Sequence, residues 1–242
     1  MTDQEHPYPK ATPELLDAAI AMDRELCDLV NEASLTGNNN DRARVGLNLI
    51  SRAVEIGTAI LYLHTPQVPL AGAARALVRP LLEAYIRGLW WCRCALDEIP
   101  AAKDNDIDGR NRRNINLYLN DHRGKKSSLW RWRTLLREIP DPAVSRWVEG
   151  TLRHKGAAPG DPTIQEMLND WTHAGVIQSI TGIGPQTIEP TYPRETQDFV
   201  VLFASTIGFL AVCEMARFMS KPDAAAASLA DIMGRYSHIV EQ

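Results

Sequence analysis

The chain has 242 residues, of which 45% are hydrophobic and 23% charged, and this composition is ordinary for a globular protein with a buried core. Its net charge of −4 argues against a protein that coats nucleic acid with its whole surface. The N-terminal stretch MTDQEHPYPKATPEL is polar and contains prolines, unlike a secretion signal, so we expect a cytoplasmic protein.

Two helices are predicted to follow a flexible arm at residues 1–11 and to open a helical domain that spans 12–242. Thr12-Pro13-Glu14 is typical of a helix start, with a capping hydroxyl, a proline at the first helical position and an acid in the first turn. Apolar residues then recur with helical period to about Leu35. The turn-forming sequence TGNNN ends this helix, and a second is expected over 41–63. Because the two are similar in length, we expect an antiparallel pair.

A third helix, predicted over residues 70–98, carries a charged side chain at every fourth position: Arg75, Arg79, Glu83 and Arg87. Residues four apart share one helix face, so these form a line of charge on an otherwise apolar helix. Such a line must be solvated, paired or functional. Glu83 can pair with both neighbouring arginines, or the arginines can hold an anion such as phosphate. Pro80 lies within the line and predicts a kink or a restart of the helix.

A basic segment follows, and we expect residues 103–160 to form a smaller helical insertion or lobe. Residues 103–155 carry 13 Lys/Arg against 7 Asp/Glu. Short helices are predicted at 109–121, 127–138 and 141–153, and Asp141 is expected to cap the last of them. The basic residues are interleaved with Tyr118, Trp130 and Trp132, which suits a nucleic-acid surface, although a plain solvated face gives the same pattern. The residues that would contact nucleic acid are Arg110, Arg112, Arg113, Lys125, Lys126, Arg131 and Arg133.

The next helix, TIQEMLNDWTHAGVIQSIT, is expected to be capped by Thr163 and holds a second group of polar residues. Asn169, Asp170 and His173 are neighbours on one helical surface because they are three or four residues apart. A histidine oriented by an aspartate can act as a general acid or base, so Asp170 and His173 are the candidate catalytic residues. The alternative is a structural histidine held by Glu83 or Glu214.

A long helix from about residue 194 to 219 contains the most apolar run of the chain, FVVLFASTIGFLAVC. This run is shorter than the roughly 20 residues that a bilayer-spanning helix needs, so we expect a core helix and no membrane partner. Glu214 and Arg217 follow it, and a last helix follows residue 223. We expect the three polar sets to converge on one site, with ligand-binding residues Arg79, Glu83, Arg87, Asn169, Glu214 and Arg217.

Several kinds of chemistry have no motif in the chain. There is no phosphate-binding glycine loop, no HExxH and no GxSxG. The four cysteines include no CxxC pair, and Cys92 and Cys94 are one residue apart, which puts them on different sides of a helix. We therefore expect no metal and no cofactor.

The core-helix sequence RPLLEAYIRGLWWCRCALDE, followed by LNDWTHAG and an apolar helix with Glu-x-x-Arg, resembles a family of uncharacterised all-helical bacterial proteins. They share an R-P-L-x-E-x-x-x-R-G-x-W helix and a later N-D-x-x-H-x-G helix, and the resemblance covers residues 40–220. More distantly, the plan is similar to the HEPN superfamily, many of whose members are dimeric ribonucleases of toxin–antitoxin and phage-defence systems. Their hallmark, an arginine four to six residues before a histidine, is missing here, because Asn169 precedes His173 and Arg146 lies too far from His154.

The sequence thus predicts a single-domain all-α bundle of about six to eight helices. Its first functional interpretation is a non-enzymatic interaction protein of bacterial stress or defence, acting as a homodimer. The second is a HEPN-like ribonuclease or phosphate-ester hydrolase that uses His173 with arginines on phosphate. The third is a ligand-sensing pocket. RNA or an anionic small molecule is the expected ligand in the latter two cases.

Overall fold

The computed structural model describes residues 11–33, 41–65, 70–94, 132–153, 163–172 and 194–240. Within these ranges it contains eight helices and no β-strand, which confirms the predicted all-α bundle. One hydrophobic core draws residues from every described helix. The helices are α1 (Pro13–Glu32), α2 (Asp41–Leu63), α3 (Ala71–Arg93), α5 (Trp132–Glu138), α6 (Pro142–Arg153), α7 (Ile164–Thr172), α9 (Arg194–Ala216) and α10 (Pro222–Val240).

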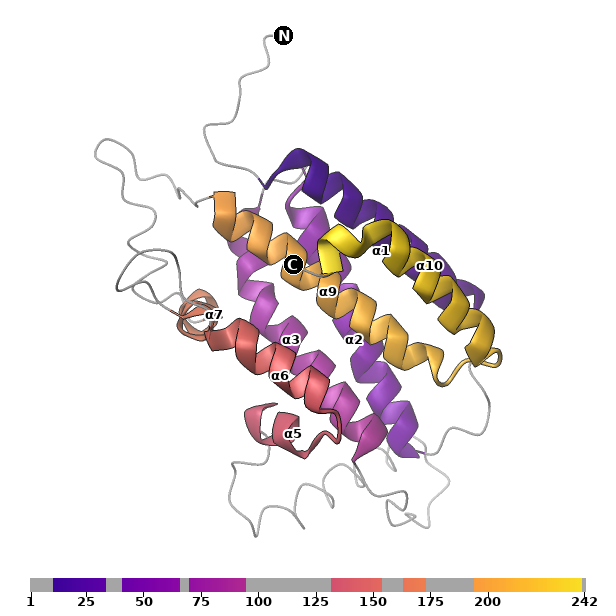
Figure 1. Ribbon diagram of the computed structural model, residues 1–242. Coiled ribbons are helices and arrows are strands. Elements are labelled where there is room, and N and C mark those ends of the chain that lie inside the picture. The colour runs from indigo at the N-terminus through magenta and orange to yellow at the C-terminus, as the bar shows by residue number, and fades with distance from the viewer. Residues whose placement is uncertain are drawn as a thin grey trace, which may run out of the picture.

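The helix α9 lies at the centre of the bundle and contacts α1, α2, α3 and α10 (Figure 1). Its apolar side chains are spread around the whole helix rather than gathered on one face, as a helix surrounded by others requires. The buried residues include Val200, Ile207 and Val212. This central helix is the apolar stretch that the sequence predicted to be core.

Within the described ranges, two helical stretches are long and apolar enough to cross a membrane when judged by length and composition alone, Ala43–Leu63 and Arg194–Ala216. In the most apolar stretch of α9, 78% of the residues are buried inside the bundle, against 44% for α2. The burial of α9 is what a core helix requires.

The closest partners in the bundle are α2 and α3, which pack on each other more extensively than any other described pair. Two glycines make this approach possible. A Cβ atom added to Gly46 would lie 2.4 Å from Cys92 Sγ, and one added to Gly88 would lie 2.7 Å from the side chain of Ile50. The two backbones are therefore in contact at a point where no side chain fits between them.

The helix α3 runs from Ala71 to Arg93 with Pro80 inside it, so the predicted restart at this proline does not occur. Of the 70–98 range expected for this helix, residues 95–98 lie outside the described part of the chain. The buried side of α3 includes Val78, Leu82 and Tyr85. Burial of this side against several helices keeps the segment helical, although the proline has no N–H to donate.

The first helix differs from its prediction in two ways. It packs more on α9 and α10 than on α2, so α1 and α2 are not the main antiparallel pair. The hydroxyl of Thr12 does not cap α1, because it donates to Asp198 Oδ2 at 2.8 Å while the Thr12 N–H donates to Oδ1 at 2.6 Å. The polar groups of Thr12 therefore attach the start of α1 to the first turns of α9 instead of capping α1.

The two other predicted caps are confirmed. Asp141 Oδ1 accepts the N–H groups of Ala143 at 3.0 Å and Val144 at 3.4 Å at the start of α6. Thr163 and Glu166 form a reciprocal capping box at the start of α7, in which each side chain accepts the other's backbone N–H.

The described part of the basic segment, residues 132–153, packs into the bundle. Its residues Leu136 and Val148 belong to the common core, and the ring of Trp147 stacks on Phe203 of α9 at 5.9 Å between centroids. The predicted helix at 109–121 and most of the expected insertion at 103–160 lie outside the described residues.

Replacing Gly88 with alanine is expected to destabilise the fold. The added Cβ would meet the backbone nitrogen of Ile50 at 3.0 Å as well as its side chain, so the two helices would have to separate. Overpacking of this kind costs about 1–3 kcal/mol, opposite in sign to the gain of about 1 kcal/mol that alanine gives over glycine in an unobstructed helix. Urea unfolding followed by circular dichroism measures the difference.

The matched control is Gly57→Ala, on the same helix as Gly46. A Cβ at Gly57 would have its nearest neighbour at 3.5 Å, the carbonyl oxygen of Ala204, which is ordinary contact. We expect this variant to be as stable as the parent or more stable. Equal destabilisation by both substitutions would contradict the close approach of α2 and α3.

Asp23 provides a pH-dependent test of the packing between α1 and α2. Thr58 donates a hydrogen bond to Asp23 Oδ1 at 3.0 Å, but burial dominates and raises the pKa of Asp23 above its ordinary 3.8. A carboxyl whose pKa is higher in the folded state than in the unfolded state loses stabilisation as the pH rises through that interval. The ionised form present at neutral pH is therefore the less stable one.

We expect Asp23→Asn to raise the free energy of unfolding at neutral pH, since the amide oxygen can still accept from Thr58 without a buried charge. The advantage should shrink as the pH falls towards 3.8, where the parent carboxyl is itself protonated. Urea titrations at several pH values between about 7 and about 4 measure this trend. A variant that is less stable at neutral pH would show that the hydrogen bond outweighs burial.

Candidate polar site on helix α3

The line of charge on α3 is an ion-pair network within one helix. Arg79 Nε lies 2.9 Å from Glu83 Oε1, and Arg87 Nη2 lies 3.0 Å from Glu83 Oε2. Each oxygen of the carboxylate thus faces a different arginine, as the four-residue spacing predicted. The side chains are between 20% and 35% exposed, so the network is partly open to solvent.

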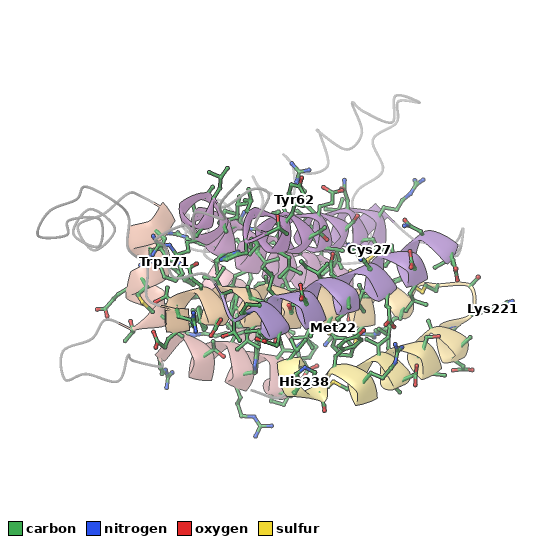
Figure 2. The ribbon with its side chains drawn as sticks, turned by 90° about the horizontal axis from the view of Figure 1, so that it is seen from above. Met22, Cys27, Tyr62, Trp171, Lys221 and His238 are labelled. Carbon is green, nitrogen blue, oxygen red and sulfur yellow. The ribbon has the colours of Figure 1, made fainter. Side chains whose placement is uncertain are left out.

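The helix α7 packs against this line and brings a second predicted group to it. Arg79 Nη1 donates to Asn169 Oδ1 at 2.9 Å, and the guanidinium of the buried Arg75 lies over the Trp171 ring at 5.2 Å from its centroid. Figure 2 shows Trp171 at the α7 end of the bundle. The structure therefore unites Arg79, Glu83 and Arg87 with Asn169, as the sequence predicted. The side chain of Asp170 and all of His173 lie outside the described residues, so their catalytic roles stay predictions.

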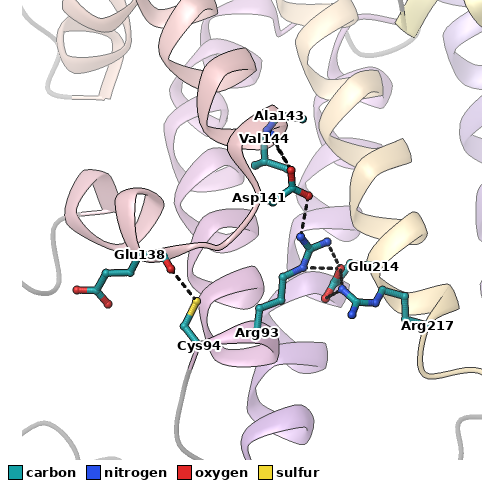
Figure 3. A network of polar contacts seen from close by, with 8 residues as sticks. All are labelled: Arg93, Cys94, Glu138, Asp141, Ala143, Val144, Glu214 and Arg217. Atoms are coloured by element: carbon teal, nitrogen blue, oxygen red, sulfur yellow. Dashed lines mark hydrogen bonds and ion pairs between the residues drawn. The ribbon is translucent and has the colours of Figure 1, made fainter.

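A second cluster forms around Arg93, in the last turn of α3 (Figure 3). Arg93 Nη2 and Nε donate to Glu214 Oε2 at 2.6 and 3.1 Å, while Nη1 donates to Asp141 Oδ2 at 2.9 Å. Glu214 is 1% exposed, and Arg217 lies 3.2 Å from the same oxygen. One guanidinium thus joins the end of α3 to α9 and to the start of α6.

The charges in this cluster shift one another's protonation. The hydrogen bond from Arg93 lowers the pKa of Asp141, and the bond to Glu214 raises the pKa of Arg93 above its already high value. Burial raises the pKa of the neighbouring Tyr85 hydroxyl and raises the pKa of the Cys213 thiol to about 11. The arginine and the aspartate are therefore held in their charged forms, while the tyrosine and the cysteine are held neutral.

The two clusters lie at different positions along the axis of α3. The single site that the sequence predicted is therefore two separate clusters. Arg93 lies ten residues beyond Glu83, or about 15 Å along a helix that rises 1.5 Å per residue. Glu214 and Arg217 are part of the cluster around Arg93, not of the cluster around Glu83. The reason is that Glu214 lies near the end of α9, and there its carboxylate meets the last turn of α3.

Arg93 is the important residue that the charge spacing missed, because it lies off the four-residue line. Two signals in the sequence point to it. It is the lone charge in the apolar stretch LWWCRC, and a carboxylate in an apolar helix, such as Glu214, requires a basic partner.

The basic residues that were predicted to contact nucleic acid lie mostly outside the described residues. Arg133 is exposed on α5, whereas the remaining six basic residues predicted to contact nucleic acid lie outside the described ranges. Among the residues that are described, no group of three or more His, Cys, Asp or Glu side chains can hold a metal ion.

Replacing Arg93 with methionine is expected to destabilise the protein by about 3–5 kcal/mol, because it leaves the buried Glu214 carboxylate without its main partner. Adding Glu214→Gln should restore part of the loss, since a neutral amide is cheaper to bury than an unpaired charge. Urea unfolding of both variants measures this. Arg79→Met is the matched control, and its partly exposed pair should cost about 1 kcal/mol or less. Equal losses at Arg79 and Arg93 would contradict the difference in burial.

Comparison of the chain with protein-family models, with curated proteins and with solved structures found no match, so the geometry of the two polar clusters is the basis for any functional conclusion.

Proposed function

We propose that this chain is a non-enzymatic helical interaction protein of the bacterial stress or defence type, acting through an interface as a cytoplasmic homodimer. The observation that supports it is the mutual neutralisation of charged residues that the sequence predicted to bind a ligand. Glu83 is held by Arg79 and Arg87, and Glu214 by Arg93 and Arg217. Networks of this kind stabilise a fold without performing chemistry.

A general base needs an oxygen or nitrogen that faces the proton to be removed. Both oxygens of Glu83 already face arginines, and Glu214 is buried against Arg93. The arginines are occupied in turn, since Arg79 also donates to Asn169. A phosphate-ester substrate at this place would have to displace existing ion pairs, and that cost weighs against the hydrolase interpretation.

The interface that the proposal requires can be tested at the junction of α2 and α3. Tyr62 is 59% exposed and Leu70 is 53% exposed, and these are the two large apolar side chains that the described chain presents to solvent. Figure 2 shows Tyr62 projecting from the outer side of the bundle. The N–H of Leu70 donates to the carbonyl of Leu63 at 2.9 Å, which holds the two ends close together. Exposed apolar side chains of this size can be buried in a contact between two copies.

We expect the purified chain to be a dimer, and the combined variant Tyr62→Ser and Leu70→Ser to shift it towards the monomer. Removing two apolar side chains from an interface weakens association, because hydrophobic burial drives it. Light scattering coupled to size-exclusion chromatography measures the mass over a range of concentrations. Ala227→Ser, at an exposed position of α10, is the control and should leave the dimer intact. A parent chain that is monomeric at every concentration would contradict the interface.

The alternative, a HEPN-like ribonuclease or phosphate-ester hydrolase, is favoured by one observation. The helix α7, which holds the first residues of the N-D-x-x-H-x-G pattern, packs on the arginine line through Asn169 and Trp171. Arginines can bind phosphate esters, and a histidine such as His173 is a residue type that can act as the general acid or base in their cleavage. The missing Arg-x(4-6)-His motif weighs against it.

RNA cleavage assays on the parent, His173→Ala and His238→Ala separate the two functions. If the chain is a non-enzymatic interaction protein, neither the parent nor either variant should cleave RNA. Cleavage that is lost in His173→Ala and kept in His238→Ala, an exposed histidine on α10, would support the hydrolase and overturn our proposal. Cleavage that persists in both variants would show an enzyme that does not use His173.

A further inference from the structure

A buried histidine and a buried glutamine face each other where the end of α2 meets the first turn of α9. His64 follows the last residue of α2 and is 6% exposed, and Gln197 in α9 is completely buried. Nε2 of the His64 ring lies 3.0 Å from Oε1 of the Gln197 amide. We call these two side chains the imidazole–amide pair. The pair joins two helices that are far apart in the sequence, and it belongs to neither of the polar clusters on α3.

The second nitrogen of the His64 ring is engaged as well. Nδ1 lies 2.9 Å from the carbonyl oxygen of Ile60, and Nδ1 carries a proton in this contact because a carbonyl oxygen can only accept. The state of Nε2 therefore decides the charge of the ring. With a proton on Nε2 the ring is a cation and needs an acceptor, whereas without that proton it is neutral and needs a donor. The amide of Gln197 contains both, an oxygen that accepts and an NH2 group that donates.

Among the described residues, the ring is the one partner that fixes which end of this amide faces it. Gln197 Nε2 is buried and has no hydrogen-bond partner in the described chain, while Oε1 faces the ring. A half-turn of the amide exchanges two groups of nearly the same size, so the packing around it is preserved. Either orientation leaves one end of the amide against the ring and the other end without a described partner. The protonation state of the ring therefore selects the orientation.

The charged groups on the surrounding elements do not pair with His64. Asp198, the neighbour of Gln197, accepts two hydrogen bonds from Thr12 at the start of α1. No ion pair among the described residues includes a histidine. The other ionisable side chains on the adjoining ends of α1, α3, α9 and α10 are the exposed Glu14, Arg194, Glu195 and His238 and the buried Arg75, whose guanidinium lies over the Trp171 ring.

We propose that the imidazole–amide pair is a proton-linked switch, in which the amide of Gln197 turns over when Nε2 of His64 gains or loses a proton. In the neutral state the amide NH2 donates to Nε2, and in the charged state Nε2 donates its proton to Oε1. Histidine is the side chain whose charge ordinarily changes between about pH 5 and about pH 8. The contact between α2 and α9 is kept in both states, so the bundle takes up a proton in its interior without losing this hydrogen bond. The proposal goes beyond the interaction function, since it requires neither the dimer interface nor a partner.

Nuclear magnetic resonance of the ¹⁵N-labelled parent chain tests the switch between about pH 8 and about pH 5. We expect the ring nitrogens of His64 and the side-chain NH2 resonances of Gln197 to shift with the same midpoint, because one proton changes both. Replacing the exposed His238 with glutamine is the control and should leave this joint shift unchanged. A Gln197 amide that stays constant while the His64 ring titrates would overturn the proposal, as would a His64 ring that keeps one charge state over the whole range.

Two substitutions at Gln197 should change the pH dependence of stability in opposite directions. The ionised carboxylate of Gln197→Glu can only accept, so it favours the charged ring, and the stability of this variant relative to the parent should rise as the pH falls. Gln197→Met offers Nε2 no acceptor and disfavours a buried charged ring, so its relative stability should decrease as the pH falls.

Urea unfolding of the two variants and the parent measures these slopes. We expect the unfolding equilibrium constants of the two variants, each divided by that of the parent, to diverge by at least about tenfold between about pH 8 and about pH 5. Slopes of the same sign in both variants would contradict the switch. The resonance measurement uses the parent chain, so it still decides between the outcomes if either variant fails to fold.

Discussion

The buried ion pair between Arg93 and Glu214 is the constraint on which the arrangement of this bundle depends. A carboxylate buried in the apolar central helix needs hydrogen-bond donors in place of water, and three guanidinium nitrogens from two arginines lie near its oxygens. Because Arg93 also holds Asp141, the same guanidinium fixes where α6 begins. The contact therefore joins α3, α6 and α9 at one point in the core.

This constraint explains why α3 carries two polar clusters with different characters. Near its middle, Arg79 and Glu83 are partly exposed and satisfy each other within one helix. At its end, Arg93 joins elements that are far apart in the sequence. The first cluster lies on the side of α3 against which α7 packs. The second joins α3, α6 and α9.

The sequence predicted those features that depend on the pattern of residues within a single helix, namely helix bounds and ion pairs four residues apart. Helical periodicity placed α2, α6 and α10 within a few residues of their observed bounds, and the spacing of Arg79, Glu83 and Arg87 predicted their pairing. It did not predict that α1 would pack mainly on α9 and α10 rather than on α2. The hydroxyl of Thr12 bonds to Asp198, across most of the chain, and no local pattern encodes that choice. Arg93 was overlooked for the same reason, because its partners come from α6 and α9.

The close approach of α2 and α3 has a consequence for the chemistry of sulfur. Cys92 Sγ lies against Gly46 so tightly that a single carbon atom would not fit between them. An oxygen atom added to this sulfur on the side that faces Gly46 would meet the same obstacle, so oxidation from that side requires α2 and α3 to separate. In the folded bundle burial shields the thiol from oxidants. The rate at which this thiol is oxidised should therefore follow how often the two helices separate, and oxidation would report on the opening of the bundle.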